Sequence, residues 1–168
     1  DAALHAVHFA ASTAGDIVET RPASDRTRAV GRGRSVQSPA FERQADATEA
    51  RAEAIAKGWA ASLTMGAGQF CTNPGIAVVV DGPAANRFVA AATEALGQVA
   101  PQTMLTDGIA AAYRDGQTRL ASRNTVRAVL TTDSPARQAS PNLFETTGPE
   151  FLQDHLLGEE VFGPLGLV

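Results

Sequence analysis

The sequence predicts an α/β fold, because alanine-rich helical patterns alternate with short apolar runs that are bounded by glycine or proline. The predicted helices span residues 46–63, 84–96, 107–121 and 149–155. The predicted strands span residues 76–80, 126–131, 142–146 and 165–168. Helical stretches separate most of these strands, so crossover connections and a largely parallel sheet are expected.

The N-terminal part of the chain is expected to differ from the rest. Residues 1–15 are small and apolar, and they suit a short buried strand that runs into a turn. Residues 16–45 keep neither the helical nor the strand period and are rich in arginine, so we expect an irregular, solvated segment. Apart from Phe41, no aromatic residue interleaves with these arginines, which argues against a site that stacks nucleic-acid bases.

A helix followed by a tight turn is expected in the middle of the chain. Asp46 or Thr48 can cap this helix, which should end near Leu63. Gly66 and Gly68 then predict a turn, because glycine adopts backbone conformations that are closed to other residues. The single cysteine of the chain follows this turn directly.

The remaining elements are predicted by apolar periodicity and by the residues that end them. Residues 76–80 form a continuous apolar run, typical of a strand buried on both faces, and Asp-Gly-Pro closes it. The helix at residues 84–96 has phenylalanine, alanine and leucine on one face and ends at Gly97. The last run, residues 165–168, looks like the start of a strand, so we expect the chain to be truncated.

The composition narrows the classes of function. A chain of 168 residues with 44% hydrophobic residues can form one domain with a core. No apolar run approaches the roughly 20 residues that cross a bilayer, and no secretion signal is apparent, so a cytoplasmic location without a membrane partner is expected. A net charge of −4 argues against a nucleic-acid partner. One cysteine and three unclustered histidines predict neither a disulfide nor a metal site.

Two motifs carry the chemistry. A lone cysteine is more often a small buried hydrophobe than a catalyst, but the residues around Cys71 favour catalysis. Gly-Gln-Phe-Cys-Thr-Asn-Pro-Gly, at residues 68–75, resembles the active-site segment of aldehyde dehydrogenases, in which a Gly-Gln-x-Cys stretch presents the nucleophile. Glu-Glu-Val-Phe-Gly-Pro, at residues 159–164, resembles the second signature of that family, Glu-x-Phe-Gly-Pro. The two motifs occur in the family's order and at close to its separation.

The resemblance covers residues 46–168 and implies the cysteine-bearing catalytic domain of the aldehyde dehydrogenase fold. It implies that the aldehyde is oxidised on Cys71, first as a thiohemiacetal and then as a thioester, with NAD or NADP as cofactor. Glu160 would then hold the cofactor ribose and Phe162 would pack beside the nicotinamide ring. Phe70 and Thr72 would face the small-molecule substrate, although packing of the loop explains them equally well. The family is homo-oligomeric, and this chain need not be.

The sequence of residues 61–75 looks most like that of the family branch that oxidises 2,5-dioxopentanoate, also called α-ketoglutaric semialdehyde, to 2-oxoglutarate. Residues 7–15 faintly resemble a turn that touches the cofactor, with Ser12 at the pyrophosphate, which would make residues 1–15 a remnant of the nucleotide-binding domain. Residues 31–36 fall where the family places its general-base glutamate, and they contain no carboxylate. An alternative hypothesis is therefore an inactive, truncated or frameshifted remnant of such an enzyme. A third reading, a cysteine-dependent hydrolase on another fold, would need a histidine base near Cys71, and the sequence offers none nearby.

Overall fold

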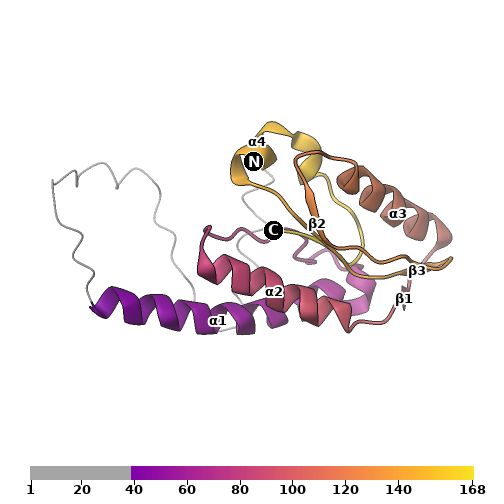
Figure 1. The fold of residues 1–168 in the computed structure, drawn as a ribbon. Helices are drawn as coiled ribbons and strands as arrows, with labels where there is room; N and C mark the ends of the chain where they lie inside the picture. The colour runs from indigo at the N-terminus through magenta and orange to yellow at the C-terminus, as the bar shows by residue number, and fades with distance from the viewer. Residues whose placement is uncertain (1–38) are drawn as a thin grey trace.

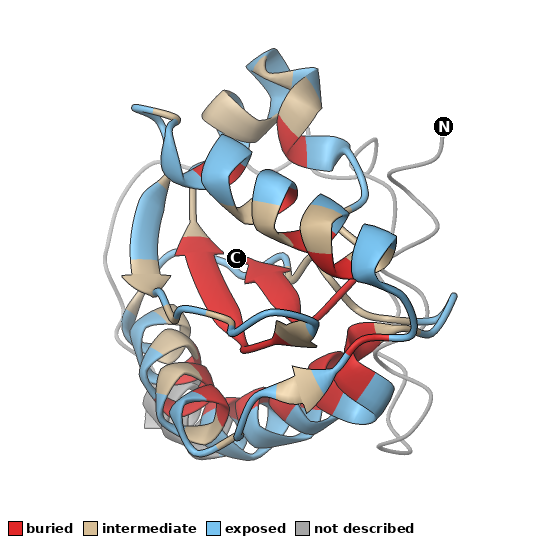
Figure 2. Ribbon diagram, turned by 90° about the vertical axis from the view of Figure 1, so that its right-hand side faces the viewer, coloured by how far each residue is buried: buried red, intermediate tan, exposed pale blue. Residues whose placement is uncertain are grey.

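The computed structural model describes residues 39–168, with side chains from Arg51 onward, and its elements form three layers (Figure 1). A helix pair, α1 (Pro39–Thr64) and α2 (Pro83–Gly97), forms one layer, and α3 (Asp107–Ala121) forms the opposite layer. Figure 2 shows buried strands between these helical layers. Helices on both sides of a sheet make this an α/β fold, as predicted.

The central sheet is mixed, so the prediction of a largely parallel sheet is wrong. Its strands are β2 (Arg127–Leu130), β4 (Asn142–Glu145) and β5 (Leu165–Leu167), in the order β2-β4-β5. β4 and β5 are parallel, and α4 (Gly148–Gln153) lies in the connection between them. β2 and β4 are antiparallel, and the chain between them contains no helix that would carry a crossover connection. A second sheet, which was not predicted, pairs β1 (Gln102–Thr103) with β3 (Gln138–Ala139).

The core lies on both faces of β4. Leu143 packs against the α1–α2 pair, whereas the next residue, Phe144, packs in the cluster that includes α3, and both side chains are fully buried. This alternation is the period of two that a strand imposes. On β5, Gly166 lies so close to Trp59 that a Cβ atom would come within 2.4 Å of the indole ring. Gly166 thus lets the sheet approach α1.

The helices begin and end largely as the sequence predicts. α1 ends at Thr64, one residue beyond the prediction, and α3 has the predicted bounds, with the Thr106 hydroxyl accepting from the Ile109 N–H at 3.1 Å. α1 begins at Pro39, so residues 39–45, predicted to be irregular, are helical. Residues 1–38, with the predicted strand at 1–15, lie outside the described residues. No helix within residues 39–168 is long and apolar enough to cross a membrane.

The buried strand predicted at residues 76–80 is wrong. Only Ile76 bridges Leu167, in parallel, and the Ala77 N–H donates to the Leu167 carbonyl at 2.9 Å. Val78 and Val80 are 77% and 90% exposed. An apolar run is buried on both faces only where elements cover it on both sides, and within the described residues this segment lies at the sheet edge.

Candidate active site

The cysteine loop begins with three consecutive residues in left-handed conformation. After α1, the 3₁₀ turn η3 (Met65–Gly68) contains Gly66, Ala67 and Gly68 at φ values of 57°, 60° and 66°. Such a run reverses the chain direction within a few residues, and glycine adopts it at the lowest steric cost. The predicted glycine turn is therefore confirmed.

Hydrogen bonds order the loop beyond this turn. The Asn73 N–H donates to the Phe70 carbonyl at 3.0 Å and so closes a turn around the cysteine. The Asn73 side-chain amide donates to the Leu63 carbonyl at 2.9 Å, which ties the loop to the end of α1. The Trp59 indole N–H donates to the Pro74 carbonyl at 2.8 Å. Two of these three bonds therefore fix the loop on α1, and the third closes the turn within the loop.

Cys71 is exposed at the tip of this ordered turn, so the interpretation as a small buried hydrophobe is wrong. Its backbone N–H forms no hydrogen bond with any residue that the structure describes. The neighbouring side chains of Phe70 and Thr72 are also exposed, Phe70 by 50%. The loop thus presents a thiol, a free N–H donor and an exposed aromatic ring together.

The two sequence motifs meet at a glycine contact. A Cβ atom on Gly68 would lie 2.3 Å from the carbonyl carbon of Gly163, which is closer than side chains tolerate. Gly163 has a φ of 152°, and a Cβ atom there would lie 2.2 Å from the Tyr113 ring. These glycines allow the loop, the second motif and α3 to pack in direct contact.

The motifs also line one pocket of about 330 Å³. The cysteine loop contributes Gly68, Asn73 and Gly75, and the second motif contributes Glu160 and Phe162. Glu160 is exposed and Phe162 is half-buried. Two predicted cofactor residues therefore lie beside the cysteine loop, whereas the side chains of the loop tip are outside the pocket lining. A more open hollow of about 440 Å³, between the C-terminal ends of α1 and α2, contains none of the predicted site residues.

A buried polar network supports the second motif, and the sequence did not predict it. The Tyr113 hydroxyl donates to the Ser140 carbonyl at 2.6 Å and accepts from the Asn142 amide at 2.9 Å. Burial raises the pKa of Tyr113 well above its usual value, although the hydrogen bond with Asn142 opposes this shift. The backbone N–H of Asn142 donates to the Pro164 carbonyl at 3.0 Å. A lone tyrosine within an alanine-rich helix was the available signal.

Comparisons with known proteins confirm the resemblance to aldehyde dehydrogenases. The chain is 43% identical over 124 residues to α-ketoglutaric semialdehyde dehydrogenase 2 of Azospirillum brasilense, a match that covers 73% of this chain and 24% of that protein. It is 34% identical over 126 residues to α-ketoglutaric semialdehyde dehydrogenase of Acinetobacter baylyi, with the same coverage of 73% and 24%. The chain thus spans about a quarter of the length of the curated relatives it matches. No family model matches the chain.

A solved structure supports the same relationship at the level of the fold. The fold resembles that of an NAD-dependent benzaldehyde dehydrogenase from Corynebacterium glutamicum, with a TM-score of 0.57 and 20% sequence identity. The similarity covers 70% of this chain and 26% of that enzyme. The chain is therefore related to a segment of the aldehyde dehydrogenases in both sequence and fold. The predicted cofactor residue Ser12 lies outside the described residues.

Proposed function

We propose that the chain forms the cysteine-bearing part of an NAD(P)-dependent aldehyde dehydrogenase, with Cys71 as nucleophile. The observation that carries the proposal is the junction of the two motifs. Residues 68–75 and 159–164 lie far apart in the sequence, yet they line one pocket and touch where Gly68 meets Gly163. An exposed, ordered thiol beside a pocket is the arrangement that covalent catalysis needs.

The pocket suits the nicotinamide end of the cofactor. Its volume of about 330 Å³ lies at the small end of the range of roughly 300–1,000 Å³ typical of small-molecule sites. The carboxylate of Glu160 can accept hydrogen bonds from ribose hydroxyls, and Phe162 offers an apolar surface for a ring. NAD or NADP, when bound, supplies the hydride acceptor.

The residues of the chain account for the covalent steps. The Cys71 thiolate forms a bond to the aldehyde carbon while the carbonyl electron pair moves to oxygen. The free N–H of Cys71 is available to donate to this oxyanion. Loss of hydride restores the carbonyl as a thioester, and water then attacks that carbon, which releases the carboxylic acid and the free thiol of Cys71.

The proposed substrate is α-ketoglutaric semialdehyde, because two relatives carry that activity in their names. A second candidate is a chain that retains the thiol and the pocket but does not turn over aldehyde. The absence of a carboxylate at residues 31–36 favours this candidate, because the deacylating water requires a general base.

The test is the formation of reduced nicotinamide, followed by absorbance, when the full chain receives α-ketoglutaric semialdehyde and NAD or NADP. We expect turnover that disappears in Cys71→Ala, whereas Glu160→Gln should mainly raise the KM for the cofactor. Benzaldehyde serves as the matched alternative aldehyde. Absence of turnover in a folded chain whose thiol still reacts with iodoacetamide would favour the second candidate.

A further inference from the structure

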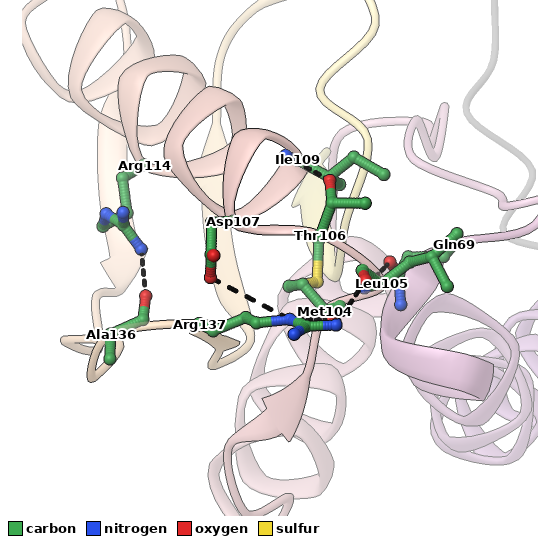
Figure 3. Close-up of polar contacts among 9 residues, drawn as sticks. All are labelled: Gln69, Met104, Leu105, Thr106, Asp107, Ile109, Arg114, Ala136 and Arg137. Carbon is green, nitrogen blue, oxygen red and sulfur yellow. Dashed lines mark hydrogen bonds and ion pairs between the residues drawn. The ribbon is translucent and has the colours of Figure 1, made fainter.

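We propose that Arg137 is a positioning residue for the cysteine loop, acting through Leu105 and Gln69 (Figure 3). The inference rests on the proposed function in taking Cys71 as the reacting group. Neither sequence motif includes Arg137, which lies on the turn before β3, 66 positions beyond the cysteine in the sequence.

The first link of this relay is the side chain of Gln69, two residues before the cysteine. Its amide nitrogen donates to the Gly66 carbonyl at 3.1 Å, within the same loop. Its amide oxygen accepts from the Leu105 N–H at 2.8 Å, across 36 positions of sequence. A second bond runs in parallel, from the Ala67 N–H to the Gln102 side chain at 2.7 Å. The segment around β1 therefore fixes the start of the cysteine loop.

The second link is the guanidinium group of Arg137, which fixes that segment. Its Nε donates to the Met104 carbonyl at 3.0 Å, and one terminal nitrogen donates to the Leu105 carbonyl. The Met104 N–H donates in return to the Arg137 carbonyl at 2.9 Å, and Asp107 lies 3.9 Å from Nε. A planar group that holds two successive carbonyls sets the orientation of the peptide that carries the Leu105 N–H.

The turn that carries Arg137 is itself held by α3. Ala136 has a φ of 41°, which is strained for a residue with a Cβ atom, and its carbonyl accepts from the guanidinium of Arg114 (Figure 3). The Gln138 N–H closes the turn on the Pro135 carbonyl at 2.9 Å. The relay thus joins α3 to the cysteine loop through polar groups alone.

The hydrogen bonds of this relay are better suited to positioning the cysteine loop than to stabilising the whole fold. Leu105 is 71% exposed, and about half of the Arg137 side chain is exposed. Exposed polar contacts contribute little to the free energy of unfolding. Without the relay, we expect the apolar ring of Phe70 to fold onto the surface and to draw the cysteine with it, because burial of exposed apolar area is favourable.

The test uses the rate of alkylation of Cys71 by iodoacetamide in the full chain, because the chain has a single cysteine. We compare the wild type with Gln69→Ala, Arg137→Met and the double variant. Because Cys71 is already exposed, loosening the cysteine loop cannot make the thiol more accessible to iodoacetamide. We expect each single variant to react at least about threefold more slowly than the wild type. The double variant should react no more slowly than either single variant, because both substitutions break the same relay. Arg127→Met, on the far strand β2, is the matched control.

A rate in Arg137→Met equal to that of the Arg127→Met control, or losses that multiply in the double variant, would overturn the proposal. A purely structural role would lower the melting temperature and leave the alkylation rate of the folded chain unchanged. If Arg137→Met does not fold, Arg137→Lys keeps the charge but replaces the planar guanidinium with a single ammonium nitrogen. It should give an intermediate rate, and a wild-type rate there would overturn the relay. The assay contains neither aldehyde nor cofactor, so its outcome is separate from that of the dehydrogenase test.

Discussion

The two segments that form the pocket are held in opposite ways. The cysteine loop, residues 65–75, is held mainly by hydrogen bonds and keeps Phe70 and the thiol exposed. The second segment continues into a buried strand, with Leu165 and Leu167 only 5% and 3% exposed, and the hydrogen bonds that support it, around Tyr113 and Asn142, are buried as well. A group that must meet a substrate cannot be fixed by burial. Directional hydrogen bonds can hold the exposed cysteine loop in place, and close packing can hold the buried second segment.

Among substitutions in the two pocket segments, the largest expected effect comes from separating these segments at their glycine contact. Gly68→Ala places a methyl group on the backbone of Gly163, which cannot move without disturbing Tyr113, so we expect about 3 kcal/mol of destabilisation from overpacking and strain. Urea unfolding followed by circular dichroism measures this change.

Gly66→Ala is the matched control for this prediction, because Gly66 has nearly the same positive φ. The nearest atoms to its added methyl group would belong to the ring of Phe70, which is half exposed and can swing away. We expect about 1 kcal/mol, from backbone strain alone. Equal losses in the two variants would show that the contact between the motifs has no energetic importance.

Removal of one buried hydroxyl group beside the second segment should also lower the free energy of unfolding. Tyr113→Phe removes the bonds with the Ser140 carbonyl and the Asn142 amide, and we expect a loss of about 2 kcal/mol for these buried bonds. Because neither the bonds to α1 nor the relay from Arg137 to Gln69 involves the Tyr113 hydroxyl, the alkylation rate of Cys71 should stay at the wild-type value. A changed rate would contradict the division into two separately held segments.

The same hydroxyl group predicts a dependence of stability on pH. Burial raises the pKa of Tyr113 in the folded state, so the folded chain retains this proton where the unfolded chain releases it. The stability contributed by Tyr113 is therefore present below the ordinary tyrosine pKa of about 10 and is lost above it, by about 1.4 kcal/mol per pH unit. Tyr113 is the only tyrosine, so its ultraviolet absorbance reports this ionisation directly. Ionisation near pH 10 without unfolding would contradict the prediction.

The sequence predicted what depends on local pattern. The bounds of α3 and the position of the glycine turn follow from caps, periodicity and glycine chemistry, which neighbouring residues encode. The contact of Gly68 with Gly163 and the relay from Arg137 to Gln69 were not predicted, because they join segments whose approach depends on the whole fold. The resemblance identified both motifs, but the residues that position them carry no motif.

The smallest expected effect lies at the sheet edge, where the sequence pattern misled. The apolar run at residues 76–80 reads as a buried strand, yet Val80 is 90% exposed. Val80→Thr exchanges similar shapes and should change the free energy of unfolding by less than about 0.5 kcal/mol. Leu143→Thr, in the fully buried strand β4, is the contrasting variant and should lose several kcal/mol, roughly 3 or more. A comparable loss in Val80→Thr would mean that another surface covers this edge in solution, because an uncovered valine has no contacts to lose.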